Sequence, residues 1–215
     1  MSHFVAHQQG LFHGLYAITH DVALLSPESL SDQVIAAIDG GARMIQYRHK
    51  KLPATLRTQQ ARALLACCRK RSVPLIINDD IALAAAIGAD GVHLGQDDPP
   101  LQTARAQLGE RAIIGTSCYN SIDLALAAQE SGADYVAFGR FFASATKPLA
   151  AGADLALLRQ AKNEITLPVI AIGGITPDNG KPLVDAGADM LAAINGLFTK
   201  TDIRTAAQQY AQLFK

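Results

Sequence analysis

The chain of 215 residues lacks an excess of charge of either sign, because 19 Lys and Arg residues balance 19 Asp and Glu residues. Proteins whose main partner is a nucleic acid or an anionic membrane usually carry a basic excess, so this balance argues against both partners. It does not exclude a small anionic ligand, which needs only a local cluster of cations. We therefore expect small-molecule substrates, with no nucleic acid and no membrane among the partners.

Long apolar runs and a disulfide framework are missing as well. The longest apolar candidate, residues 81–89, ends at Asp90, well below the ~20 residues that span a bilayer. The first ten residues lack the basic and apolar segments of a secretory signal. Three cysteines cannot form a disulfide framework, and none stands in a Cys-x-x-Cys pair. Reduced thiols and the missing signal predict a cytoplasmic location.

What the chain does contain is apolar sequence arranged in a repeat. Apolar residues make up 49% of the chain, which excludes a disordered protein. Gly-Ala followed by Arg or Asp precedes four short apolar runs, at residues 44–45, 91–94, 135–138 and 190–194. Each of these glycines follows an amphipathic stretch and suits a left-handed helix C-terminus. Four more apolar runs alternate with them, at residues 15–19, 75–78, 113–117 and 169–172.

Helix signals fill the segments between these eight candidate strands. Ser26 and Thr176 each precede a proline, which is the pattern of an N-cap followed by Pro at the first helical position. Asp80 and Ser121 are further N-cap candidates, and the last helix opens at Thr201 and Asp202. Strands that are apolar throughout are typical of a parallel sheet buried on both faces. Eight strand–helix units predict an α/β fold, a (β/α)₈ TIM barrel.

The alternative fold is a doubly wound open sheet that binds a dinucleotide. Such a fold requires Gly-x-Gly-x-x-Gly after its first strand, whereas here the first strand runs into residues 19–21 (Thr-His-Asp). The repeat also continues to the C-terminus, which favours a closed barrel. We expect an N-terminal extension of residues 1–14 and a single catalytic barrel domain of residues 15–215.

Candidate binding residues follow the second and fifth strands, where barrels of this kind place their chemistry. Gln46, Arg48 and Lys50 alternate, so an extended chain points them to the same side. Two cations and an amide suit a phosphate or diphosphate group, and a solvated strand end is the alternative. Ser117 ends strand five, where its hydroxyl either donates to a phosphate or caps the following turn. His93 lies within strand four, as a hydrogen-bonded core residue or as a catalytic one.

Carboxylates gather at the ends of strands three and four. Residues 78–80 (Asn-Asp-Asp) end one strand, and Asp97 and Asp98 follow the next. Facing Arg and Lys, such carboxylates indicate a Mg²⁺ site, because Mg²⁺ prefers one or two carboxylates together with substrate phosphates and water. The competing interpretation makes Asp80 a helix N-cap and makes Asp97 or Asp98 the cap of a helix that starts at residues 99–100.

Three later loops complete the inventory. Residues 139–152 mix small residues, hydroxyls and Lys147, as in a loop that closes over a charged substrate or in an ordinary surface loop. Gly173 and Gly174 let backbone N–H groups approach a phosphate, and strand eight ends at Asn195. No general base or activated nucleophile is evident. Two anion sites without a base suit displacement of diphosphate, in which Mg²⁺, Lys and Arg neutralise the departing oxygens.

Several of these runs resemble the thiamine-phosphate synthase family, namely residues 46–50, 75–79, 88–98, 114–117, 146–147 and 171–175. The resemblance extends from Tyr16 to Phe198. It implies a barrel enzyme of thiamine biosynthesis, a transferase that couples hydroxymethylpyrimidine diphosphate to thiazole phosphate. The expected course is dissociative: diphosphate leaves, a pyrimidine cation forms, and the thiazole nitrogen captures it to give thiamine phosphate.

The resemblance also implies roles for individual residues. The pyrimidine diphosphate would be held by Gln46, Arg48, Lys50, Asn78, Ser117 and Lys147. The thiazole phosphate would meet Ser144, Ala145, Thr146, Gly174, Ile194 and Asn195. Mg²⁺, the implied cofactor, would be ligated by Asp79 and Asp98. The candidates for a catalytic role are Lys147, Arg48 and Ser117.

The chain departs from the family pattern at three places and leaves alternatives open. Ser144 replaces a Thr and Asn195 replaces a Ser. Strand five is usually followed by a His in the family, whereas here the run is Ser117, Cys118 and Tyr119. A thiazole tautomerase would use that His and lose part of the diphosphate site. A sugar-phosphate isomerase or aldolase would need a base or Lys at a strand centre. A barrel that binds thiamine precursors without turnover is a third alternative. The oligomeric state, including a homo-oligomer, is left open.

Overall fold

In the computed structural model, which describes residues 10–21, 25–143 and 152–215, eight parallel strands close into a barrel. The strands are β1 (Gly14–Ile18), β2 (Ala42–Tyr47), β3 (Leu75–Asn78), β4 (Gly91–Leu94), β5 (Ile113–Tyr119), β6 (Tyr135–Phe138), β7 (Val169–Ile172) and β8 (Met190–Ala193). They pair in sequence order, and β8 closes the barrel by pairing with β1. The predicted (β/α)₈ barrel is confirmed. The division at residue 14 stays a prediction.

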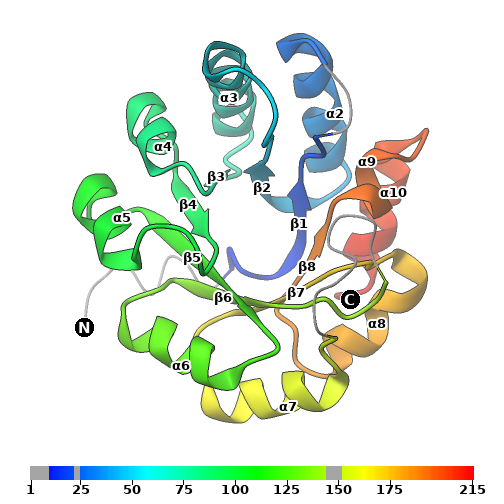
Figure 1. Ribbon diagram of the computed structural model, residues 1–215. Helices are drawn as coiled ribbons and strands as arrows, with labels where there is room; N and C mark the ends of the chain where they lie inside the picture. The colour runs from blue at the N-terminus through cyan, green and yellow to red at the C-terminus, as the bar shows by residue number, and fades with distance from the viewer. Residues whose placement is uncertain (1–9, 22–24, 144–151) are drawn as a thin grey trace.

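Helices surround the barrel and alternate with its strands (Figure 1). They are α2 (Pro27–Asp39), α3 (Ala54–Arg69), α4 (Ile81–Ile87), α5 (Leu101–Leu108), α6 (Ile122–Glu130), α7 (Leu155–Glu164), α8 (Pro177–Asp185), α9 (Asn195–Phe198) and α10 (Ile203–Gln212). Within the described ranges, none of these helices has the length and apolar character needed to cross a membrane. The short helix α9 directly follows β8 and had no signal in the sequence.

The predicted helix N-caps are confirmed by their hydrogen bonds. Ser26, Asp80, Ser121 and Asp202 each accept a hydrogen bond from the backbone N–H three residues further on. Thr176 begins α8 with a capping box, in which its own backbone N–H donates to the side chain of Asn179 at 2.8 Å. These side chains satisfy N–H groups that have no partner inside the helix, and they fix where each helix starts relative to its strand.

Helix α5 begins differently from the expectation that Asp97 or Asp98 caps it. Its N-cap is Pro100, and no side chain caps this helix by a hydrogen bond. The carboxylate of Asp98 instead accepts a hydrogen bond from the backbone N–H of Gly95 at 2.6 Å. The capping interpretation of Asp97 and Asp98 was therefore wrong, because the carboxylate turns back toward the end of β4 rather than forward to the helix.

The alternation of side chains along the strands creates two separate cores. In β1, Leu15 and Ala17 pack outward against the helices, whereas Tyr16 and Ile18 point into the barrel. The interior cluster consists of large residues from several strands: Tyr16, Met44, Ile76, Ile113, Tyr135, Ile170 and Met190. Phe12, which precedes β1, packs beneath them with its ring centroid 5.7 Å from that of Tyr135. Side chains of this cluster therefore fill the barrel below the strand ends, and among the described residues the cavity inside the barrel lies at the C-terminal ends of the strands.

Candidate active site

A cavity of about 460 Å³ lies inside the barrel at the C-terminal ends of the strands. Every strand, or the segment that follows it, contributes to its lining. The volume lies within the usual range for small-molecule sites. Among the residues predicted to bind substrates, the cavity brings together Gln46, Arg48, Asn78, Ser117, Gly174, Ile194 and Asn195.

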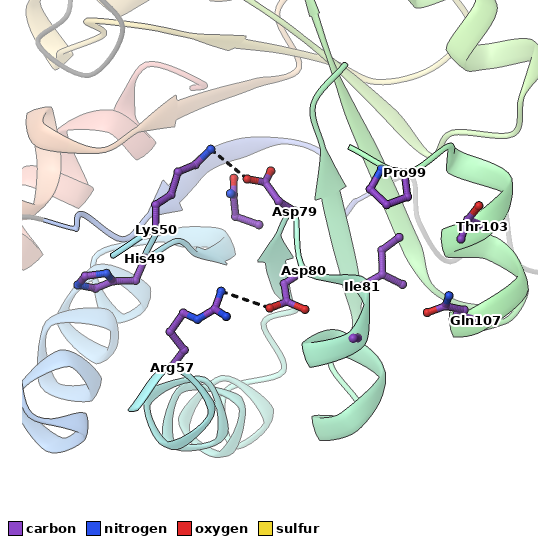
Figure 2. Close-up of a pocket in the computed structure, with 11 residues that line it drawn as sticks. His49, Lys50, Arg57, Asp79, Asp80, Ile81, Pro99, Thr103 and Gln107 are labelled. Carbon is purple, nitrogen blue, oxygen red and sulfur yellow. Dashed lines mark ion pairs between the residues drawn. The ribbon is translucent and has the colours of Figure 1, made fainter. Parts of the chain in front are cut away.

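A second cavity, of about 570 Å³, lies beside the first and shares Asn78 with it. Figure 2 shows Lys50 reaching toward Asp79, with 3.1 Å between Nζ and Oδ2. Below them Arg57 of α3 pairs with Asp80, with 3.3 Å between Nη1 and Oδ2. Lys50 and Asp79 therefore line this outer cavity rather than the barrel interior. Asn78 stands where the two cavities adjoin.

Arg48 is held in place by two residues of the chain after β1. Its Nη1 lies 3.0 Å from Oδ2 of Asp21, and both side chains are largely buried. Its backbone N–H donates to the hydroxyl of Thr19 at 2.9 Å. The ion pair fixes the guanidinium at the rim of the inner cavity, where further N–H donors of its planar fork can meet an anion. The sequence did not mark Asp21, because a single carboxylate after a strand carries no distinctive signal.

Asp79 and Asp98 approach each other at the ends of β3 and β4. The backbone of Asp79 is left-handed, with φ at +62°, and its N–H donates to the carbonyl of His93 at 2.9 Å. Burial raises the pKa of the Asp98 carboxyl, and the neighbouring Asp79 raises it further, against the lowering by the Gly95 N–H. A carboxylate whose charge is disfavoured by burial and by a neighbouring carboxylate forms a site that a cation would stabilise.

These two carboxylates fit the ligand preference of Mg²⁺. In the described part of the chain no group of three or more His, Cys, Asp or Glu residues is arranged to hold a metal ion. A closed all-protein site is thus not formed there, whereas Mg²⁺ commonly takes one or two carboxylates and completes its octahedron with phosphates and water. Lys50, at 3.1 Å from Asp79, adds positive charge to the same place.

The loop after β7 brings backbone rather than side chains to the inner cavity. Gly173 and Gly174 have φ values of +106° and +64°, which residues with a side chain rarely adopt. A Cβ on Gly173 would lie 2.3 Å from the Cβ of Arg140, so the two loops touch at this point. The helix α8 starts three residues later, and such a helix start with glycine backbone suits an anion.

A chain of hydrogen bonds crosses the barrel beneath the inner cavity. The Nε2 group of Gln46 donates to the hydroxyl of Tyr16 at 2.8 Å, and that hydroxyl lies 2.9 Å from the hydroxyl of Tyr135. Tyr135 also lies 3.0 Å from Nδ1 of His93, whose Nε2 lies 2.9 Å from Oγ of Ser117. His93 is hydrogen-bonded, as a core residue would be, and it also lines the cavity, as a catalytic residue would. The structure therefore leaves both interpretations of His93 in place. The sequence did not single out Tyr16 or Tyr135.

Four predicted site residues, Ser144, Ala145, Thr146 and Lys147, lie outside the described residues. The described part of their loop reaches the cavity, where Gly139, Arg140 and Ala143 contribute to the lining. At the opposite side of the mouth, Ile194 and Asn195 follow β8 at the start of α9.

Comparisons with known proteins agree with this geometry. The family model described as thiamine monophosphate synthase matches residues 15–197. The thiamine-phosphate synthase of Nitrosococcus oceani is 53% identical over 201 residues, covering 94% of this chain and 92% of that protein. The corresponding protein of Thiobacillus denitrificans is 52% identical over 201 residues, with 94% of both chains covered.

Solved structures of similar fold include a member of the same family. The thiamine phosphate pyrophosphorylase from Pyrococcus furiosus superimposes with a TM-score of 0.83 at 32% identity, covering 94% of this chain and 96% of that chain. A GGGPS from Thermoplasma volcanium has a TM-score of 0.73 at 16% identity, covering 100% of this chain and 98% of that chain. The second likeness is one of fold alone.

Proposed function

The chain belongs to the thiamine-phosphate synthase family and is an enzyme with that activity, and we propose that the two cavities at the barrel mouth are its substrate sites. The substrates are hydroxymethylpyrimidine diphosphate and thiazole phosphate. The observation that carries this placement is the inner cavity, which gathers predicted binding residues from β2, β3 and β5 and from the segments that follow β2, β7 and β8.

The diphosphate end of the pyrimidine substrate lies near Asn78, between the two cavities. Arg48 approaches from the inner cavity and Lys50 from the outer one, so cations flank this position on two sides. Asp79 and Asp98 would hold Mg²⁺ beside the same group, and their paired carboxylates support that assignment. The ion, when bound, supplies neutralisation of the charge that develops on the departing oxygens.

The thiazole phosphate lies on the opposite side of the inner cavity. Gly174 offers backbone groups beside the start of α8, and Ile194 and Asn195 face the same space. We extend this pocket to Ser144, Ala145 and Thr146, which the family resemblance assigns to it. Lys147 completes the proposal as a further cation toward the diphosphate.

The reaction needs no protein nucleophile in this arrangement. The bond between the pyrimidine methylene carbon and the diphosphate oxygen breaks, and the thiazole nitrogen forms the new bond to that carbon. Arg48 and Ser117 donate hydrogen bonds to the departing oxygens, which gain negative charge in this step. Cys118 is not suited to attack, because it is fully buried and burial raises the pKa of its thiol to about 12.

The decisive experiment incubates the purified chain with both substrates and Mg²⁺ and follows thiamine phosphate together with released diphosphate. We expect equimolar formation of the two products, and none when either substrate is omitted. Tight binding of both substrates without any product would instead identify a barrel that only binds thiamine precursors. Isomerisation of the thiazole substrate alone would identify a tautomerase.

We also propose that the enzyme works in the cytoplasm. Cys67, Cys68 and Cys118 are all free and buried, which agrees with a reducing cytoplasm. Sedimentation of the purified protein will establish whether it forms a homo-oligomer.

A further inference from the structure

The hydrogen-bond chain beneath the inner cavity has a direction, which follows from counting donors. A tyrosine hydroxyl has one proton to donate, whereas its oxygen can accept more than one hydrogen bond. Gln46 donates its amide N–H to the oxygen of Tyr16, so Tyr16 cannot use its own proton on Gln46. Among the described residues, the other hydrogen-bond neighbour of this hydroxyl is the oxygen of Tyr135, at 2.9 Å. Tyr16 therefore donates to Tyr135.

The direction then passes from Tyr135 to the cavity. Since the Tyr135 oxygen accepts from Tyr16, its proton is free to donate to Nδ1 of His93 at 3.0 Å. A histidine nitrogen that accepts carries no proton, so the proton of the neutral ring is on Nε2. That Nε2–H donates to Oγ of Ser117 at 2.9 Å. With its oxygen engaged in this way, Ser117 keeps its own proton for a group in the cavity.

We propose that Tyr135 is a positioning residue, which holds His93 in the Nε2–H tautomer and thereby makes the Ser117 hydroxyl a hydrogen-bond donor toward the substrate. Tyr135 itself is not among the residues that line the inner cavity. It acts through His93, from the floor of the barrel. The part of this inference that concerns the substrate rests on the proposed function, because a diphosphate oxygen accepts hydrogen bonds and cannot donate them.

The surroundings of Tyr135 support a fixed hydroxyl. Its side chain is fully buried, and burial raises the pKa of both Tyr135 and Tyr16 well above the ordinary tyrosine value, so both keep their protons. Opposite its ring stands Gly115, where a Cβ would lie 1.9 Å from the ring carbon that carries the hydroxyl. The ring of His93 stacks on that of Tyr135 with 5.6 Å between centroids.

The reversed chain is the competing arrangement, and it makes the opposite prediction. In it Gln46 would turn its amide oxygen toward Tyr16, every hydroxyl proton would point the other way, and His93 would carry its proton on Nδ1. Ser117 would then donate to His93 and present only its oxygen to the cavity. That oxygen would face an anionic diphosphate with no proton between them.

The first test is nitrogen-15 NMR of the imidazole rings in the substrate-free protein, with the His93 signal identified by its loss in His93→Gln. We expect the Nε2–H tautomer in the wild-type chain and a mixture of tautomers in Tyr135→Phe. The Nδ1–H tautomer in the wild type would overturn the proposal. This measurement requires no turnover, so it is independent of whether the chain makes thiamine phosphate.

The second test is a double-mutant cycle on kcat/KM for the pyrimidine diphosphate. Ser117→Ala should lower this constant by about tenfold or more, as expected when a hydrogen bond to a charged group is lost. Tyr135→Phe should lower it by a smaller factor. If Tyr135 acts through Ser117, the double variant should be no slower than Ser117→Ala. Fully additive losses would show that Tyr135 affects the rate by another route and would overturn the proposal.

Tyr47→Phe is the matched control. Tyr47 is a buried strand tyrosine whose hydroxyl donates to Oε1 of Gln60 at 2.7 Å, and its side chain packs in the outer core. Its loss removes one buried hydrogen bond of the same kind, away from the barrel interior. We expect no change in the His93 tautomer and none in kcat/KM. Melting temperatures of both Phe variants will show that the comparison is made between folded proteins.

Discussion

Replacement of Asp79 by Asn separates the charge of this carboxylate from its structural role. Asp79 adopts a left-handed backbone, with φ at +62°. Asn tolerates this conformation, whereas Ala at the same position would add a backbone cost of ~1–2 kcal/mol. The side chains are also nearly equal in size. Asp79→Asn is therefore the substitution that tests metal binding with the least disturbance of the strand end.

The expected magnitudes differ for stability and for turnover. The ion pair with Lys50 is solvent-exposed, with 52% of the Lys50 side chain and 30% of the Asp79 side chain accessible, so its loss should change the free energy of unfolding by at most ~1 kcal/mol. A metal ion contributes several kcal/mol of charge stabilisation to a transition state. A loss of ~3 kcal/mol corresponds to a fall in kcat/KM of roughly two orders of magnitude.

The assay is product formation at increasing Mg²⁺ concentration, for the wild type, Asp79→Asn and Asp80→Ala. Asp80 is the neighbouring carboxylate, and it caps α4 by accepting from the Leu83 N–H at 2.8 Å. Its loss should lower stability by ~1 kcal/mol and leave the response to Mg²⁺ unchanged. Asp79→Asn should show the reverse, with little change in stability and a higher Mg²⁺ requirement. Wild-type turnover and Mg²⁺ response in Asp79→Asn would refute the assignment.

Three further predictions concern other parts of the barrel. Gly173→Ala should raise the KM for thiazole phosphate in steady-state assays, because φ is +106° and the added Cβ would lie 2.3 Å from that of Arg140; an unchanged KM would contradict the role of this loop. Gly115→Ala should destabilise the protein by ~1–3 kcal/mol or more in urea unfolding, since the Cβ meets the enclosed ring of Tyr135; a loss below ~0.5 kcal/mol would show that the ring moves freely. Cys118 should resist alkylation at about pH 8 in the native protein and react only after unfolding, because burial raises its pKa to about 12; peptide mass spectrometry measures both states, and rapid native labelling would contradict the burial.

The strands that the sequence predicts best are those whose side chains are apolar on both faces. The bounds expected for β3, β4, β6 and β7 are those observed, since each run is short and apolar and is buried between the helices and the barrel interior. β2 is longer than expected and extends to Tyr47. Its interior position is held by a polar residue, Gln46, which is only 2% exposed. Hydrophobic pattern alone cannot identify a strand that buries an amide.

The candidate site was predicted less completely than the fold, because residue order does not give direction beyond a strand end. The alternating spacing of Gln46, Arg48 and Lys50 predicted that all three side chains point to one side of an extended chain. β2 ends at Tyr47, however, and only Gln46 and Arg48 line the inner cavity, whereas Lys50 lines the outer one. The helix α9 gave no signal, since its four residues include neither a capping hydrogen bond nor an apolar repeat. Asp21 was missed for a similar reason, because its partner Arg48 is 27 residues away.

The polar interior of the barrel explains why the missed residues belong to one system. A buried tyrosine hydroxyl without a partner is costly, and here Tyr16 and Tyr135 bond each other while each also bonds a further side chain, Gln46 or His93. The two tyrosines come from β1 and β6, 119 residues apart, and each alone reads as an ordinary core aromatic. Gly115 leaves the space that the ring of Tyr135 fills. Gln46, His93 and Ser117, which face the cavity, are joined through this pair, and their hydrogen-bonding directions are therefore set by the floor of the barrel as much as by the substrate.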